Sequence, residues 1–383
     1  MHKRIGDLPV ELSSVTRFVM DQLSPFIHEK RARSIAFGVV GVLFADRLSG
    51  ADVGRGIARA HGTSPKHGIK QFDRLLSNEG FDVPTCFQAS VPLVVGERKE
   101  IVVALDWTEY ASDGHSRIAL NLVTNHGRAT PLVWMTVASD QLKWRRNSYE
   151  DEVLNLLARC LPEGVNVIVL ADRGFADIKL FELLREDLGW DFVIRVRKGM
   201  TVTMPSGLVW EVGSAVPLDT SIAELPETLF TRRKFPVTIV CTQDEGMKEP
   251  WCLATTLTGQ KQRVVQLYGR RFSIEHAFRD EKDLNCGLGM EWSSIGDPKR
   301  RDRFLFVVMF ATLILTLLGA AGEQVGGDRQ LRANTAKRRT HSLFRQGKEY
   351  LMGCASRLIR QLRAAFEQLL GSIRRVHETF ALL

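Results

Sequence analysis

The stretch Glu100-Ile-Val-Val-Ala-Leu-Asp106-Trp107 decides the fold class, together with Val165-Asn-Val-Ile-Val-Leu-Ala-Asp172 further along the chain. Each stretch is a short apolar run rich in β-branched residues, which is typical of a buried strand. Each run also leads to an aspartate, Asp106 in the first and Asp172 in the second. We therefore predict two buried strands that both end in an acid.

The segments around these two strands indicate the order of the sheet. Runs rich in Val, Ile, Leu and Trp predict further strands, and Ser148 is a helix N-cap followed by acids in the first turn. The predicted segments are strands at 115–124, 128–139 and 190–197 and helices at 148–160 and 177–188. This order is that of a ribonuclease H-like mixed sheet with helices on its faces. In such a sheet the first and fourth strands lie side by side.

Asp106 and Asp172 are therefore expected to meet at the C-terminal ends of neighbouring strands. Open α/β sheets bind their ligands beyond these ends. Two carboxylates without a cation of their own repel each other unless a divalent ion lies between them. Ligands that offer only hard oxygen atoms select Mg²⁺ or Mn²⁺. The sequence thus predicts a metal site at this edge of the sheet.

A third acid comes from the stretch Tyr268-Gly-Arg-Arg-Phe-Ser-Ile-Glu275-His-Ala-Phe-Arg-Asp-Glu-Lys282. If the stretch forms one helix, four polar residues fall within an arc of about 60°. These four are Tyr268, Arg271, Glu275 and Lys282. Cations beside a metal-binding carboxylate are useful when phosphate binds there too. For this stretch alone, an ordinary solvated face with an Arg-Glu pair is an equal alternative. With the two aspartates, Glu275 completes a set suited to two ions, Mg²⁺ or Mn²⁺, acting on a phosphodiester.

Residues 1–85 read as helical and include a helix-turn-helix pattern. One helix candidate spans Ser49 to His61 and stops at Gly62, and a second begins with Ser64 as N-cap and Pro65 at the first helical position. The second helix carries Lys66, Lys70 and Arg74. Such a unit would place its second helix against DNA. A plain helical hairpin is the alternative.

Composition favours a soluble protein with a polyanionic partner. The chain has 383 residues, a net charge of +8 and 44% hydrophobic residues. Residues 323–383 hold twelve Lys or Arg against five Asp or Glu, so nearly all of the excess positive charge lies there. The six cysteines form no C-x-x-C pair, which argues against a zinc site and fits a reducing cytoplasm. The apolar run Phe304 to Gly322 is interpreted as a buried core helix and not as a membrane span.

These patterns divide the chain into four predicted parts. Residues 1–90 form a helical DNA-binding domain, and residues 91–198 with 260–322 form the ribonuclease H-like catalytic domain. Strand-like segments separated by Gly, Pro and Asp turns predict a β-rich insertion at 199–259. Residues 323–383 form a basic helical C-terminal region.

The chain resembles the DDE transposases of bacterial insertion sequences that carry the Y-R-E-K signature, the insertion-sequence-four family. The signature is Tyr, two residues, Arg, three residues, Glu, six residues and Lys, and the stretch from Tyr268 to Lys282 matches it without a gap. Asp106 in Leu-Asp-Trp-Thr and Asp172 in Ala-Asp-Arg-Gly-Phe resemble the two other acids of the family. The resemblance covers roughly residues 30–320, and it includes the β-rich insertion.

The resemblance implies a DNA transposase of the bacterial cytoplasm, associated with the nucleoid. Its substrates are the terminal inverted repeats of an element and a target DNA, held by a homodimer in a synaptic complex. Tyr268, Arg271 and Lys282 are expected to contact phosphates near the cut. Trp251 occupies the position from which an aromatic ring stacks on a flipped base in the family. The alternative is that Trp251 is a core residue of the insertion.

Two other functions fit the same residues. A structure- or site-specific nuclease on the same sheet would hydrolyse DNA without joining strands. A DNA-binding regulator derived from a transposase would have no catalysis at all. The retained acids favour an enzyme, and the phosphate-binding stretch and the insertion favour the transposase.

Overall fold

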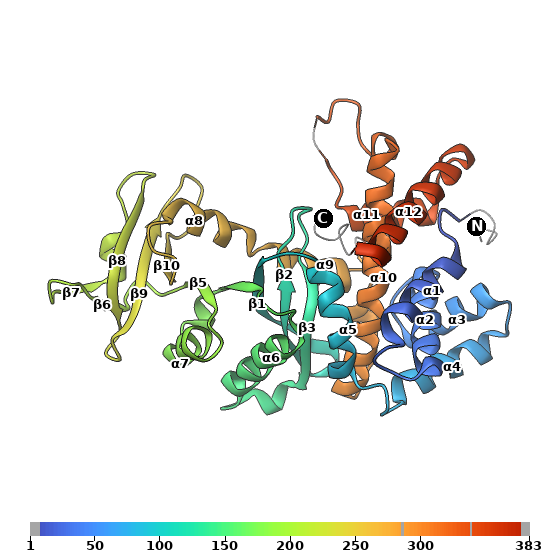
Figure 1. Cartoon of the computed structure of the whole chain (residues 1–383), viewed down its shortest axis with the longest axis horizontal. Helices are drawn as coiled ribbons and strands as arrows, with labels where there is room; N and C mark the ends of the chain where they lie inside the picture. Colours follow the sequence, from blue (N-terminus) through green and yellow to red (C-terminus); the bar gives the residue numbers. More distant parts are fainter. Residues whose placement is uncertain (1–7, 285–286, 338, 377–383) are drawn as a thin grey trace.

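A mixed sheet of ten strands runs through the part of the chain that the computed structural model describes, which is residues 8–284, 287–337 and 339–376. The strands lie in the order β3-β2-β1-β4-β5-β10-β9-β8-β6-β7. Figure 1 shows β6 to β10 at one end of the molecule and a group of helices at the other. The strands are β1 Glu100–Tyr110, β2 His115–Leu122, β3 Thr130–Ala138, β4 Asn166–Ala171, β5 Asp191–Arg195, β6 Thr201–Thr203, β7 Val209–Glu211, β8 Ile222–Phe230, β9 Phe235–Thr242 and β10 Trp251–Thr255.

The first five strands have the order predicted from the sequence. β1 pairs with β2 in the antiparallel sense and with β4 in the parallel sense, and β4 pairs in parallel with β5. This is the ribonuclease H-like arrangement, in which the strand that carries Asp106 adjoins the strand that leads to Asp172. The mixed sheet with flanking helices confirms the predicted fold class.

The β-rich segment continues this sheet. β10 pairs with β5 in the antiparallel sense, and β9, β8, β6 and β7 follow outward. One of these strands, β8, was not predicted from the sequence. Its segment contains Pro226 and acidic residues, and a register shift lies between Leu225 and Thr228. Glu227 in this bulge has φ of +54°, so the alternation that marks a strand is interrupted.

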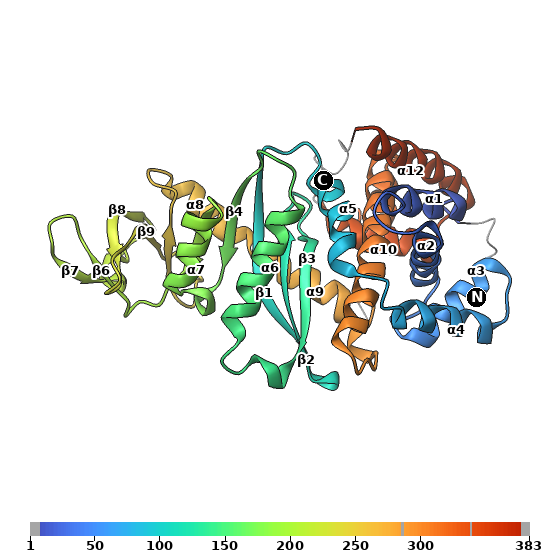
Figure 2. The same cartoon turned by 60° about the horizontal axis from the view of Figure 1, so that its bottom comes forward.

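The helices cover both faces of the sheet and form a bundle beside β3 (Figure 2). They are α1 Leu12–Leu23, α2 Glu29–Leu43, α3 Gly50–His61, α4 Pro65–Ser77, α5 Val83–Val95, α6 Arg146–Cys160, α7 Ile178–Glu182, α8 Lys261–Arg270, α9 Ser273–Lys282, α10 Pro298–Gln324, α11 Leu343–Met352 and α12 Ser356–Val376.

Helix α10 is the centre of the helical bundle. It is long and apolar enough to cross a membrane, and 89% of its most apolar window is buried inside the protein. Because α2, α11, α12 and β3 pack around it, it is apolar on all sides. Phe306 packs against Phe87 and Trp134, and Phe304 packs against Phe72 of α4. The predicted core helix is therefore confirmed as the element that joins the N-terminal helices to the sheet.

Helices α10 and α11 approach so closely that only glycine fits between them. A Cβ atom on Gly347 of α11 would overlap the carbonyl oxygen of Leu315 in α10. We expect Gly347→Ala to lower the free energy of unfolding by about 3 kcal/mol, because backbone cannot yield as a flexible side chain can. Urea unfolding measures this value. Gly50→Ala is the matched control, since its Cβ meets nothing within 4 Å; equal values for both variants would contradict the prediction.

The two predicted N-terminal helices form, as α3 and α4. Gly62 ends α3 in the left-handed region at φ of +65°, where glycine is favoured. Ser64 caps α4, accepting a hydrogen bond from the backbone of His67, and Pro65 is its first residue. Gly54 and Gly68 face each other where the two helices touch, because a Cβ on either would overlap backbone of the other helix. The pair is thus closely packed.

Candidate active site

Asp106 and Asp172 occupy neighbouring positions on β1 and β4. The parallel register pairs Leu105 with Ala171, so the next residue on each chain is an acid. Asp172 follows the end of β4 and accepts a hydrogen bond from the backbone of Gly174 at 2.8 Å. The prediction that Asp106 ends its strand is wrong, because β1 continues to Tyr110 through its antiparallel pairing with β2. What ends at Asp106 is the pairing with β4.

Glu275 reaches the same site through Arg271. One guanidinium nitrogen of Arg271 lies 3.3 Å from Asp106 Oδ2, and the other lies 2.7 Å from Glu275 Oε1. Arg271 is only 6% exposed, whereas both carboxylates are partly accessible. Two of the three predicted acids therefore share one buried cation, and the third adjoins Asp106 by strand register.

The stretch from Tyr268 to Lys282 is two helices and not the single helix that was assumed. α8 ends at Arg270 and α9 begins at Ser273. At the junction the backbone bonds join residues three apart, from Arg271 to Tyr268 and from Ile274 to Arg271. The contact of Arg271 with Glu275, four residues on, still forms. The Arg271–Glu275 pair therefore survives the break. Tyr268 and Lys282 lie on different helices, so the predicted arc of four residues on one helix does not form.

The pKa of Asp106 is raised to about 6, chiefly by burial, and the charges of Asp172 and Glu275 act in the same direction. The Arg271 guanidinium and the backbone N–H of Trp107 act in the opposite direction. The net rise means that burial and the neighbouring carboxylates outweigh the positive charge of Arg271 at this carboxylate. Such a site favours an added cation.

The set of donors suits a hard divalent cation, because all three predicted ligands are carboxylates. Within the described residues, however, no three side chains of His, Cys, Asp or Glu are grouped as a metal site. Arg271 occupies the space between Asp106 and Glu275 instead. A metal ion that binds all three acids must therefore displace a guanidinium nitrogen of Arg271 from Asp106 or from Glu275.

Tyr268 and Trp251 pack against each other beside the site. Their rings meet edge to face at 4.8 Å between centroids, and the ring of Phe272 lies 6.4 Å from that of Trp251. Tyr268 is 1% exposed, and burial raises its pKa. Its ring faces the Arg271 guanidinium at 5.8 Å. In this arrangement the buried Tyr268 ring packs against the Arg271 guanidinium, and Trp251 is partly accessible.

Lys282 is held at the far end of β1. Its ammonium group donates to the carbonyl oxygen of Glu109 and lies 4.7 Å from the centroid of the Tyr110 ring. Burial lowers its pKa. Glu109 and Tyr110 end β1, so Lys282 lies further along this strand than Asp106.

A buried polar network around Tyr110 holds this end of β1, and sequence reasoning missed it. The guanidinium of Arg301 lies 4.0 Å from the centroid of the Tyr110 ring and that of Arg117 lies 5.6 Å from it. Glu281 accepts from the Tyr110 hydroxyl and pairs with Arg117 at 2.9 Å. Arg117 in the middle of an apolar strand was the available signal, because a buried cation needs a partner.

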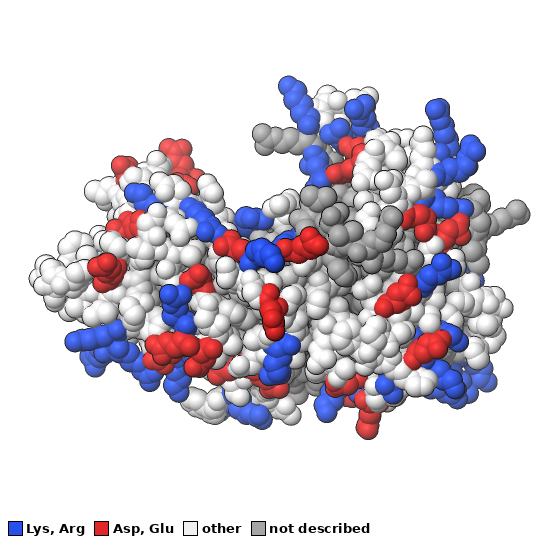
Figure 3. Space-filling model, in the orientation of Figure 1, with Lys and Arg blue, Asp and Glu red and all other residues white. Residues whose placement is uncertain are grey.

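The three cations predicted on the second helix of the pair are exposed. Lys66, Lys70 and Arg74 lie on α4, and Lys70 and Arg74 line a hollow together with His67. Figure 3 shows further Lys and Arg side chains projecting from the region of α11 and α12. Exposed positive charge thus lies on α4 and in the region of α11 and α12.

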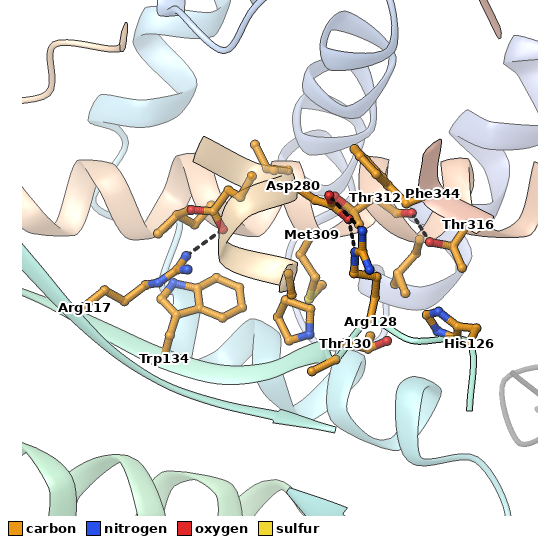
Figure 4. Close-up of a pocket in the computed structure, with 17 residues that line it drawn as sticks. Arg117, His126, Arg128, Thr130, Trp134, Asp280, Met309, Thr312, Thr316 and Phe344 are labelled. Atoms are coloured by element: carbon orange, nitrogen blue, oxygen red, sulfur yellow. Dashed lines mark hydrogen bonds and ion pairs between the residues drawn. The ribbon is translucent and has the colours of Figure 1, made fainter. Parts of the chain in front are cut away.

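A small cavity lies between β2, β3, α9 and α10, and it is lined by Arg117, His126, Trp134 and Asp280 among others (Figure 4). Arg128 donates to Asp280 at 2.5 Å across its mouth. The side-chain nitrogen of Trp134 is buried without a hydrogen-bond partner. This cavity is separated from the three predicted metal ligands, because none of them lines it.

His126 in this cavity makes the stability of the protein depend on pH. Burial lowers its pKa to about 4, and the charges of Arg339 and Arg128 contribute. The unfolded chain therefore binds a proton more readily than the folded chain between pH 6.5 and 4. Since His126 is partly exposed, we expect its effect over this window to be about 2 kcal/mol of stability, lost as the pH falls. Urea unfolding of His126→Gln should show a flatter profile over this range, and an unchanged profile would contradict the assignment.

Comparison with known families identifies part of this fold. Residues 135–311 match the family model described as a transposase DDE domain. The matched region covers a little under half of the chain, includes Asp172 and Glu275, and begins after Asp106. Comparison with curated proteins gave no match. The family match, together with the ribonuclease H-like order of strands, supports a DDE transposase.

Proposed function

We propose that this protein cleaves DNA at the ends of an insertion sequence and joins the freed 3′-hydroxyl to target DNA. The observation that carries the proposal is the Arg271 bridge between Asp106 and Glu275, with Asp172 in register beside Asp106. Two of the three acids thus share a cation that suits phosphate, and the third is the register neighbour of Asp106. In this proposal the protein belongs to the insertion-sequence-four family with the Y-R-E-K signature.

In the proposed mechanism, Asp106, Asp172 and Glu275 would hold two ions, Mg²⁺ or Mn²⁺. When bound, these ions would lower the pKa of a water or 3′-hydroxyl and stabilise the leaving oxygen. Arg271, released from one carboxylate, offers its planar guanidinium to a phosphate. Tyr268 positions Arg271 through the face of its ring. Trp251 stacks on a base at the cut end.

The partners of the proposed reaction are the terminal inverted repeats and a target DNA, bound by a homodimer in the bacterial cytoplasm at the nucleoid. Lys66, Lys70 and Arg74 on α4 supply the exposed positive charge that would face the DNA backbone. The cations of α11 and α12 extend this charge (Figure 3). We assign the helical region of residues 1–90 to DNA binding on this basis.

A strand-transfer assay tests the proposal. The purified protein is incubated with Mg²⁺, with DNA taken from both flanks of its gene, and with a target plasmid. We expect nicked ends and joined products. Nicks without joined products would support a nuclease on the same sheet instead. If Asp172→Ala retained the full biological activity, the protein would be a regulator without catalysis.

Lys282 gives a separate prediction on DNA binding. Replacing Lys282 with alanine should reduce the salt slope of binding to cut ends by about one phosphate contact. The physical reason is that each cation that pairs with a phosphate releases a counterion from the DNA, so the loss of one such cation lowers the slope. Binding at several salt concentrations measures the slope. A slope equal to that of the wild type would show that Lys282 only stabilises the end of β1.

A further inference from the structure

The loop between β3 and α6 presents an aromatic ring to solvent. Trp144 is 93% exposed, more than any other aromatic residue in the described ranges. Its φ of +67° lies in the left-handed region, where a bulky residue is rare and costs about 1–3 kcal/mol. Burial of an indole normally stabilises a fold. An indole held outward from a strained backbone contributes nothing to this fold.

Cations surround Trp144 on both sides. Its neighbours Lys143, Arg145 and Arg146 are all exposed. The Arg146 Nε atom lies 3.4 Å from Glu150 Oε1. Among the described residues Lys143 and Arg145 have no ion-pair partner. The prediction of Ser148 as N-cap with acids in the first turn is wrong, because helix α6 begins at Arg146 without a side-chain cap and without an acid in its first turn. The ring therefore lies in a field that attracts an anion.

Two contacts fix the loop beside the strands that carry the catalytic acids. The Arg146 guanidinium lies 5.1 Å from the centroid of the Trp107 ring, and Trp107 directly follows Asp106. Asn147 donates to Asp177 at 2.6 Å, on the segment that leaves Asp172. Both anchors lie just beyond the paired strand ends. The loop is therefore at the same edge of the sheet as the candidate active site.

We propose that Lys143, Trp144, Arg145 and Arg146 form a binding site for an unpaired DNA strand, with the indole of Trp144 stacked on a base. The inference rests on the proposed DNA-processing function. Inside a duplex both faces of a base are covered by its neighbours, so a free ring can stack on an internal base only where the strand is single. The three cations hold the phosphates of that strand, and the ring holds a base without regard to its identity.

Fluorescence anisotropy tests the site with two labelled duplexes in metal-free buffer, one blunt and one with a short single-stranded thymidine tail. Trp144→Ala should bind the tailed duplex about ten-fold more weakly than the wild type does, since stacking contributes about 1–3 kcal/mol per base. Its affinity for the blunt duplex should not change. Trp144→Phe retains an aromatic ring and should recover most of the loss. A fluorescent adenine analogue in the tail reports the stacking directly by its quenching.

Trp292→Ala is the matched control, because Trp292 is also exposed, at 66%, but lies outside the loop. The inference is overturned if both alanine variants bind the tailed duplex alike, or if Trp144→Ala loses blunt and tailed DNA equally. The strand-transfer assay judges the proposed function independently. If the wild type joins strands and Trp144→Ala still binds the tailed duplex more tightly than the blunt duplex, only the proposed binding site at Trp144 is wrong. If the wild type only nicks DNA and Trp144→Ala loses the preference for the tailed duplex, the proposed transposase function is wrong and the proposed binding site at Trp144 stands.

Discussion

Asp172→Ala will bind DNA about as tightly as the wild type and cleave it at least about a thousand-fold more slowly, because several kcal/mol of transition-state stabilisation pass through such a ligand. Asp172 is partly exposed at the end of β4 and has a single backbone contact, to Gly174, so its removal should leave the fold intact. Asp106→Ala and Glu275→Ala should lose cleavage in the same way. Gel-shift binding and a cleavage assay with Mg²⁺ measure the two properties separately.

Glu291→Ala is the control for these variants. Glu291 is an exposed acid shortly after α9 and is not one of the three predicted ligands. Its replacement should leave cleavage within about two-fold of the wild type, since a surface acid without a role in the site changes little. Normal cleavage by Glu275→Ala, with loss in Glu291→Ala, would reassign the third ligand.

Arg271→Gln will destabilise the metal-free protein by about 2 kcal/mol and will make its stability depend strongly on Mg²⁺. The substitution removes the cation that Asp106 and Glu275 share, and leaves the two carboxylates without that compensating charge. An added ion can replace the lost charge. Urea unfolding with and without Mg²⁺ should therefore show a larger stabilisation by the metal for this variant than for the wild type.

The neighbouring Arg270 provides the comparison. It is exposed and contacts the carbonyl of Thr124 and the side chain of Asn125, away from the three acids. Arg270→Gln should cost less than about 1 kcal/mol and should not alter the response to Mg²⁺. If Mg²⁺ stabilised all three proteins equally, Arg271 would not occupy the place of a metal ion.

The positions of Asp106 and Asp172 were predictable because they depend on local pattern and strand order. An apolar run forms a strand wherever it is buried on both faces, and the order of elements places β1 beside β4. The register then follows from the apolar residues before each acid. The apolar helix α10 was predictable from its composition, and the tertiary structure shows that other helices and β3 surround it.

The surroundings of Lys282 were not predictable in this way. Its partners Glu109 and Tyr110 lie more than 170 residues earlier in the chain, and the Arg301 and Arg117 side chains that share the Tyr110 ring come from two other elements. A helical arc drawn on the sequence assumed that α8 and α9 were continuous. The break at Arg271 changes the direction of every residue that follows it.

The sequence by itself determined which residues carry charge, which strands are buried and that Asp106 and Asp172 would be neighbours. Only the tertiary structure decided that Arg271 lies between Asp106 and Glu275. The physical reason is that hydrophobic periodicity is local, whereas the partner of a buried charge is chosen by packing among elements far apart in the chain.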